Sequence, residues 1–423
     1  MIKTRSELIY LLTDASEIEH SLCCIYLFAA FSLKRSIDEG VTWEQLLRIQ
    51  DWMQTTLLIA REEMEHLGLA SNLLTSIGGS PSFHRANFPQ PARYFPFDLT
   101  LEAFSEATVK RFVCFERPIH IRPEDCFCFD GPNVRVSANS GRLTPHNVPY
   151  KTIGELYMIL REAFIDYPAP DSELFIGPPD AQVGGAELGL NLNRVGESGG
   201  GYDIFLFPVV DRASAVKAID TIIEQGEGTH SDDKESHYYR FLDVLHELQA
   251  MKEKDPDFEP ARKVMPNPLL DQPRDTTGGN IVTNPTTRQV LDLFNDSYAL
   301  MLQILIRFYA HTNETQEELN GLRYAAFFPM MTMVIRPLSE ILTTLPFGEK
   351  DDGFVAGPSF EYENDLGFLP HRQAAWQVIL ERMETLAIDA AAVAKLPDVP
   401  PRLAYVAQNI ELVRRKFAEY LVL

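Results

Sequence analysis

The segment Glu63-Met64-Glu65-His66 contains the residue types best suited to chemistry. Glu63 and His66 stand three positions apart, so on a helix both side chains project from the same face, one turn from each other. A helix of a four-helix bundle offers a bridging carboxylate and an imidazole to a pair of metal ions with this spacing. Because the spacing is common by chance, its meaning depends on whether these residues face a core.

Glu63 lies within the apolar stripe of a helix that we predict over residues 42–77, between Ala60 and Leu67. An ionised carboxylate on a core face costs on the order of several kcal/mol unless a metal ion or a cationic side chain compensates its charge. The position of Glu63 therefore favours a metal ligand over a surface acid.

Glu19 repeats this pattern in a helix predicted over residues 4–37, where it lies between Ala15 and Leu22. Two neighbouring helices would thus each place one carboxylate in the core at mid-length. Alternatively, Arg or Lys partners neutralise the two acids, although basic residues are scarce on both faces. His20 lies on a flanking face, which is more typical of a core or outer-sphere histidine than of a ligand.

A four-helix site also needs ligands from the second pair of helices. Two candidates, Glu155 and Glu162, lie on the helix that Thr152 opens. Thr152 and Glu155 have the spacing of a capping box, so Glu155 either caps its helix or faces the metals, and the sequence leaves both readings open.

The last bundle helix is predicted to continue its inner face from Ile219 and Ile223 to Glu227, whereas Glu224 faces outward. His237 follows on the next apolar stripe. Glu227 and His237 can therefore supply the second pair of ligands, separated by a broken turn instead of standing three positions apart.

Five sequence motifs in this order give the chain a family resemblance: EIEH (17–20), EEMEHLGLASNLLTSIGG (62–79), TIGELY (152–157), IIEQGEGT (222–229) and SHYYRF (236–241). The chain resembles the ferritin-like family that includes the iminophenyl-pyruvate dimer synthase domain of bacterial indole-alkaloid pathways such as those for violacein and rebeccamycin. The likeness covers roughly residues 4–250, and the segment AGPSFE at 356–361 adds to it.

The resemblance implies a four-helix bundle with a di-metal centre. Its metal ligands would be the six residues Glu19, Glu63, His66, Glu155, Glu227 and His237. Glu63 and Glu227 would bridge the two ions, Glu19 and Glu155 would be terminal, and each histidine would hold one ion. Carboxylates with imidazoles suit iron, with manganese as the alternative. The sequence departs from the ferritin pattern at 224–227, where the E-x-x-H spacing is missing.

The expected fold class is mainly α: a ferritin-like four-helix bundle with long loop and short-strand insertions, followed by a second helical domain. Helical periodicity predicts a bundle over residues 1–254, a polar, Pro-rich linker over 255–286 and C-terminal helices over 287–423. The segment GYDIFLFPVV, residues 201–210, is the best candidate for a strand.

The composition limits the classes of partner. The chain has 423 residues, with 60 Asp and Glu against 38 Lys and Arg, which gives a net charge of −22. This charge argues against nucleic acid and anionic membranes as partners. The N-terminus lacks the pattern of a signal peptide. We therefore expect a cytoplasmic protein that acts on a small molecule, and a homo-oligomer is compatible with the sequence.

The expected function is a metal-dependent oxidoreductase, most simply a di-iron enzyme that oxidises a small organic substrate with O₂ or peroxide, in keeping with secondary metabolism. The alternative is a non-catalytic ferritin-like protein with a metal-storage or structural role. Long insertions between the helices favour a bounded substrate pocket over a storage cage. The sequence identifies no catalytic residue beyond the metal ligands.

Overall fold

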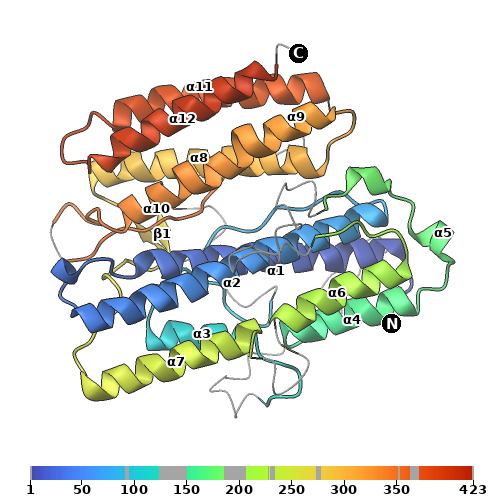
Figure 1. The fold of residues 1–423 in the computed structure, drawn as a ribbon, viewed down its shortest axis with the longest axis horizontal. Helices are drawn as coiled ribbons and strands as arrows, with labels where there is room; N and C mark the ends of the chain where they lie inside the picture. Colours follow the sequence, from blue (N-terminus) through green and yellow to red (C-terminus); the bar gives the residue numbers. More distant parts are fainter. Residues whose placement is uncertain are drawn as a thin grey trace, which may run out of the picture.

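The computed structural model describes residues 2–90, 95–122, 150–184, 206–226, 228, 234–272, 278–350, 353–362 and 371–421. Its architecture is mainly α, as the sequence predicts, and the helices lie in stacked layers (Figure 1).

Two long helices, α1 (Arg5–Ser32) and α2 (Trp43–Ser76), form the central layer and pack along their lengths (Figure 1). Each begins at a threonine in a capping box: Thr4 accepts from the backbone N–H of Glu7, and Thr42 accepts from that of Gln45. These contacts satisfy backbone donors that have no partner inside the helix, which fixes where each helix begins.

Four shorter helices take the places of the third and fourth bundle helices. α3 (Glu106–Phe115) packs against α7 (His237–Lys254), and α4 (Ile153–Ile165) packs against α6 (Arg212–Gly226). In Figure 1 these two pairs lie end to end beneath α1 and α2. The third and fourth helices of the bundle are therefore each interrupted at mid-length, and four helix ends meet near the centre of the bundle.

The breaks follow from local sequence. Glu116 caps the C-terminus of α3, and Pro118 cannot continue a helix. α6 ends at Gly226, and Gly228 has a φ of 77°, a left-handed conformation that glycine adopts without steric cost.

The smaller elements are η1 (Ile37–Glu39), α5 (Asp171–Leu174), η3 (Pro179–Ala181), β1 (Pro268–Leu269) and β2 (Asn280–Ile281). β1 and β2 pair in parallel, with Pro268 opposite Asn280, and they are the only strands in the described part of the chain. The predicted strand is wrong where it can be checked: residues 206–210 belong to no strand, and residues 201–205 lie outside the described residues.

The C-terminal half consists of α8 (Pro285–Tyr309), a long helix over Gln316–Leu342, α11 (Arg372–Val393) and α12 (Arg402–Glu419). The long helix includes α9 (Gln316–Asn320), the π-helical segments η5 (Gly321–Phe327) and η6 (Met330–Ile335), and α10 (Arg336–Leu342). Among the described helices, it alone is long and apolar enough to cross a membrane. However, 67% of its most apolar window is buried inside the protein, as in a core helix.

The two halves share one continuous cluster of buried apolar residues. α8 contributes an apolar stripe to this cluster, with buried side chains at Leu291, Phe294, Tyr298, Leu302 and Leu305. The segment that follows α7 also runs against the bundle. The backbone N–H of Lys34 donates to Pro260, and that of Arg262 donates to Ser32. The predicted domain boundaries at 254 and 287 stay a prediction.

Candidate metal centre

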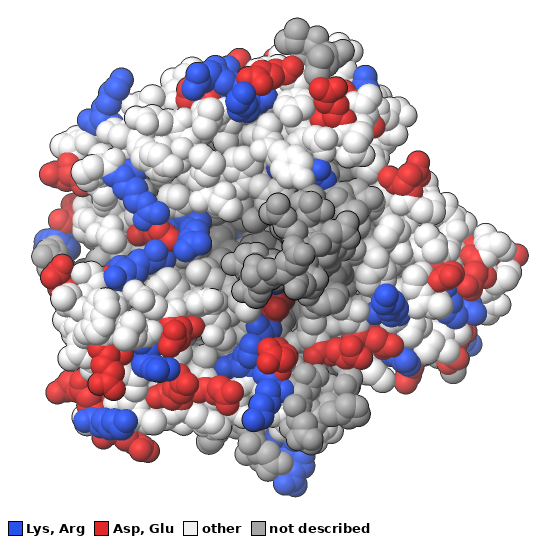
Figure 2. Space-filling view, viewed as in Figure 1, with Lys and Arg blue, Asp and Glu red and all other residues white. Residues whose placement is uncertain are grey.

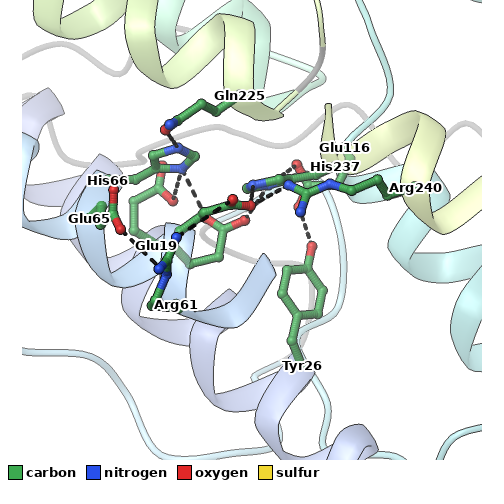
Figure 3. Close-up of polar contacts among 11 residues, drawn as sticks. Glu19, Tyr26, Arg61, Glu65, His66, Glu116, Gln225, His237 and Arg240 are labelled. Carbon is green, nitrogen blue, oxygen red and sulfur yellow. Dashed lines mark hydrogen bonds and ion pairs between the residues drawn. The ribbon is translucent and has the colours of Figure 1, made fainter. Parts of the chain in front are cut away.

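Five ionisable side chains meet where the third and fourth bundle positions are broken (Figure 3). α1 provides Glu19, α2 provides Glu63 and His66, the C-cap of α3 is Glu116, and α7 begins with His237. None of them is more than 4% exposed. The long helices thus place three of these groups at mid-bundle, and two helix ends bring the other two.

Glu63 is the centre of this cluster, with one imidazole at each of its carboxylate oxygens. His66 Nδ1 lies 3.2 Å from Oε2 of Glu63, and His237 Nδ1 lies 2.8 Å from Oε1. Each imidazole also faces a second carboxylate at 3.6 Å, which is Oε2 of Glu19 for His66 and Oε2 of Glu116 for His237. The cluster therefore has two matching sides, one on each side of Glu63.

Two buried tyrosines hold the outer carboxylates. The hydroxyl of Tyr157 donates to Oε1 of Glu19, and the hydroxyl of Tyr26 donates to Oε1 of Glu116. Burial and the neighbouring carboxylates raise the pKa of both tyrosines well above the usual value, so they remain hydrogen-bond donors. In each carboxylate, Oε2 stays directed toward an imidazole.

The far nitrogen of each imidazole is held by an acceptor. His66 Nε2 lies 3.0 Å from the amide oxygen of Gln225, and His237 Nε2 lies 3.1 Å from Oε2 of Glu62. Arg240 donates to the same oxygen of Glu62. Burial raises the pKa of Glu62, but His237 and Arg240 outweigh it and lower that pKa to about 2. Both Nε2 atoms can therefore carry the proton, which leaves both Nδ1 atoms as donors to a metal.

The electrostatics of the cluster favour added positive charge. Burial, followed by repulsion from Glu63, raises the pKa of Glu19 to about 7. Burial lowers the pKa of His66, but attraction from Glu63 and Glu19 outweighs it and raises that pKa to about 10. His237 shifts in the same direction for the same reason. Without a metal, protons on the histidines thus balance part of the negative charge, and a cation can take their place.

The geometry of the cluster fits a metal ion. Oε1 of Glu63 and Nδ1 of His237 are buried and 2.8 Å apart, yet neither has a hydrogen-bond partner among the described residues. Donor atoms of Glu63, His66 and His237 all lie within 4.8 Å of one another, as ligands of a shared ion must. A set of carboxylate oxygens and imidazole nitrogens suits iron or manganese.

A small cavity adjoins the cluster, with a volume of about 20 Å³. Glu19, Glu63, His66, Glu116 and Tyr157 form its polar side, whereas Leu22, Ile153, Ile222, Ile223 and Gly226 form its apolar side. A Cβ atom at Gly226 would stand 3.4 Å from Oε2 of Glu116, an ordinary van der Waals contact, so this wall of the cavity lies directly beside the carboxylate. The cavity has room for a water-sized body.

The structure brings together four of the six predicted ligands: Glu19, Glu63, His66 and His237. Glu227 lies outside the described residues, and Glu224 is exposed, as its predicted outward position requires. The binding of a metal by these residues stays a prediction.

Glu155 is not among the residues that the structure brings together, which corrects its predicted position. Its carboxylate accepts from the backbone N–H of Lys151 at 2.6 Å, and its own N–H donates to Thr152. Glu155 thus caps the N-terminus of α4, which is one of the two roles that the sequence allowed. The other candidate, Glu162, is exposed.

Glu116 occupies the place expected for Glu155, although it was not predicted from the sequence. The stripe of Val109, Phe112 and Val113 continues to Glu116 at helical spacing, and these three apolar residues are buried. The same signal that identified Glu19 and Glu63 was therefore present here. His20 lies outside the cluster, as its flanking position predicted. Glu62 supports His237, and His20 contacts Tyr298 and the carbonyl of Phe83 in the core.

Comparison with known proteins shows which family the chain resembles. A family model described as ferritin-like matches residues 12–246. Dichlorochromopyrrolate synthase from Lentzea aerocolonigenes is 30% identical over 99% of this chain and 41% of that protein. The 2-imino-3-(indol-3-yl)propanoate dimerase from Chromobacterium violaceum is 29% identical over 99% of this chain and 40% of that protein. The chain thus spans about two fifths of the length of these relatives.

Among solved structures, a ferritin-like protein from Caulobacter vibrioides is similar with a TM-score of 0.47 and 17% identity. The match covers 85% of this chain and 99% of that protein.

Proposed function

We propose, from the premise that the chain belongs to the ferritin-like family, that it is a metal-dependent enzyme of a biosynthetic pathway. It would oxidise a small organic substrate with O₂ or peroxide. The observation that carries this proposal is the arrangement around Glu63, in which each carboxylate oxygen faces the Nδ1 atom of a different histidine. Such an arrangement suits a carboxylate that bridges two ions.

The residues that would hold two iron ions, or manganese as the alternative, are Glu19, Glu63, His66, Glu116 and His237, with Glu227 as a further predicted ligand. Bound ions would supply redox and Lewis-acid chemistry. Tyr157 and Tyr26 would orient the terminal carboxylates, and the cluster's burial would exclude bulk water.

The relatives suggest the class of substrate. One is named as a dimerase of an indolyl 2-imino acid and the other as a synthase of dichlorochromopyrrolate. We therefore propose a 2-imino acid with an aromatic side chain as the substrate and oxidative coupling of two molecules as the reaction. A new bond between two carbons that each lose one hydrogen releases two electrons and two protons. Hydrogen peroxide accepts them to give two water molecules, and O₂ accepts them to give hydrogen peroxide.

The apolar side of the cavity suits an aromatic substrate. Ile153 begins α4, whereas Ile222 and Ile223 lie near the end of α6. A cavity of about 20 Å³ cannot enclose two aromatic molecules. The substrate would therefore bind against the outer side of this wall, or in a state in which these helix ends have separated.

The test is a coupling assay. Protein loaded with Fe²⁺ is given an aryl 2-imino acid, made in place by an amino-acid oxidase, together with O₂ or hydrogen peroxide. We expect a product with the mass of two substrate molecules minus two hydrogens, and we expect Glu63→Ala to abolish it. Glu340→Gln, far from the cluster in the C-terminal half, is the matched control and should retain turnover. Uptake and release of iron without such a product would support the storage alternative instead.

A further inference from the structure

Among the described residues, the two sides of the cluster have the same kinds of ligand but differ in the groups beside the outer nitrogen of each imidazole. Figure 3 shows Gln225 beside His66 and Arg240 beside His237. On each side of Glu63 stand one histidine facing it through Nδ1, one carboxylate 3.6 Å from that nitrogen, and one tyrosine that donates to this carboxylate. We call these sides the His66 position and the His237 position. Among the described residues, the inner ligands do not distinguish the two positions.

The difference lies in what holds the outer nitrogen of each imidazole. At the His66 position the acceptor is the neutral amide of Gln225, at 3.0 Å. At the His237 position it is the carboxylate of Glu62, at 3.1 Å, and Arg240 holds this carboxylate in place. All three outer groups are only partly buried, so their exchange for residues of the same size leaves the packed core untouched.

An anionic acceptor makes an imidazole a stronger ligand than a neutral acceptor does. It stabilises positive charge on the ring, and a metal ion bound at Nδ1 places such charge there. Groups of this kind typically change metal affinity by about 10- to 100-fold when they are mutated. The charge of Arg240 offsets part of the charge of Glu62, so the lower end of this range applies.

We propose that the two positions are unequal and that a divalent cation binds the His237 position first and more tightly, because Glu62 supports His237 whereas Gln225 supports His66. This inference rests on the proposed metal binding and deepens it. Glu62 and Gln225 act through the histidines and are positioning residues.

The test is a titration of metal-free protein with Co²⁺ without oxygen, followed by its visible absorption. We expect two binding steps whose dissociation constants differ by about tenfold or more. His66→Ala should keep the tight step, and His237→Ala should lose it. Thermal unfolding of each metal-free variant checks that the protein remains folded.

Two matched variants separate built-in inequality from simple repulsion between two ions. Glu62→Gln should bring the two constants together by weakening the tight step. Gln225→Glu should bring them together by strengthening the weak step. Repulsion alone would leave the separation unchanged in both variants, and that result would overturn the inference. A wild-type protein that binds no Co²⁺ would overturn the proposed function as well, whereas two ions bound with one affinity would overturn this inference alone.

Discussion

Buried acids occur in both halves of the molecule, but the acids of the cluster have different partners from those of the C-terminal half. In the N-terminal bundle, Glu19, Glu63 and Glu116 contact histidines and tyrosines. In the C-terminal half, Glu314 and Glu340 contact arginines. An arginine keeps its charge at every pH at which the protein folds, so an acid beside it is neutralised permanently. A histidine can exchange its proton for a metal ion.

The arginine-paired acids belong to the fold. The side chains of Arg307 and Glu314 are almost fully buried together, and Trp376 also donates to Glu314. Figure 2 shows basic side chains gathered around an acidic one on the left of the face, at the level of α10 in Figure 1. Glu340 contacts Arg35 from beyond the end of α1 and Arg402 from the start of α12, and thereby ties these elements to α10. A buried acid therefore marks a candidate site when its partners can be displaced.

The largest expected effect comes from separating the two halves. A fragment of residues 1–254 should be poorly soluble, because it would expose the apolar surface that the shared core covers. It would also lose contacts such as that of Arg85 with the carbonyl of Phe360. Sedimentation after expression measures this, with the full chain as the control. A soluble, metal-loaded and active fragment would show that the C-terminal half is an independent module.

Next in size is the loss of metal from Glu63→Ala. Because Glu63 faces both histidines, its removal should lower occupancy at both positions, from near two ions per chain to well below one. Elemental analysis of purified protein measures this. Glu340→Gln is the matched control, since it removes a buried charge but should keep both ions. Equal metal contents in the two variants would contradict the distinction between acids that face histidines and acids that face arginines.

Glu340→Gln should instead lower stability, by about 1–2 kcal/mol at pH 7. Loss of one partner of a buried ion pair costs more than this, about 3–5 kcal/mol, but the side chains of Arg336 and Arg402 are 53% and 49% exposed and can be hydrated. Urea unfolding measures the difference. A destabilisation equal to that of a surface Glu→Gln variant would contradict this role.

The same variant has a predictable pH dependence. Burial raises the pKa of Glu340, but its arginines outweigh burial and lower it below the usual value. Stability from Glu340 is therefore present above the unfolded pKa, about 4.3, and is lost as the pH falls through the lower, folded pKa. The stability difference between wild type and Glu340→Gln should shrink between pH 7 and pH 3.

The smallest expected effect concerns the end of α6. Glu224 is exposed, so Glu224→Gln should leave metal content unchanged. Glu227 was predicted on the inner face, so Glu227→Gln should weaken metal binding. The reverse order, measured by the same elemental analysis, would show that the inner-face register at the end of α6 is wrong.

The sequence predicted the central layer because its signals are continuous. The stripes of α1 and α2 run for many turns, so an acid within them, such as Glu19 or Glu63, stands out against apolar neighbours on both sides. His66 followed from its spacing of three residues from Glu63 on the same helix. The partners of His20 could not be predicted, because Tyr298 comes from the other half of the chain.

The layer of α3, α4, α6 and α7 was harder to predict, because the sequence signals at helix ends indicate only where a helix begins or stops. Thr152 and Glu155 indicated a capping box, but the sequence did not reveal whether that helix end faces the metals or Glu155 merely caps it. Glu116 stands one residue beyond α3, at a C-cap, so its helix gives it apolar stripe neighbours on the N-terminal side alone. Which of several helix ends meets the centre depends on how α3, α4, α6 and α7 pair, and this pairing is a property of tertiary packing.

The most direct test of the central claim is anomalous scattering from crystals of protein purified with iron or manganese. We expect two peaks about 3.5–4 Å apart, one on each side of Glu63. One should lie beside Nδ1 of His66, and the other beside Nδ1 of His237. The absence of any peak at this cluster, or metal bound elsewhere while Glu63 contacts protein groups alone, would contradict the claim.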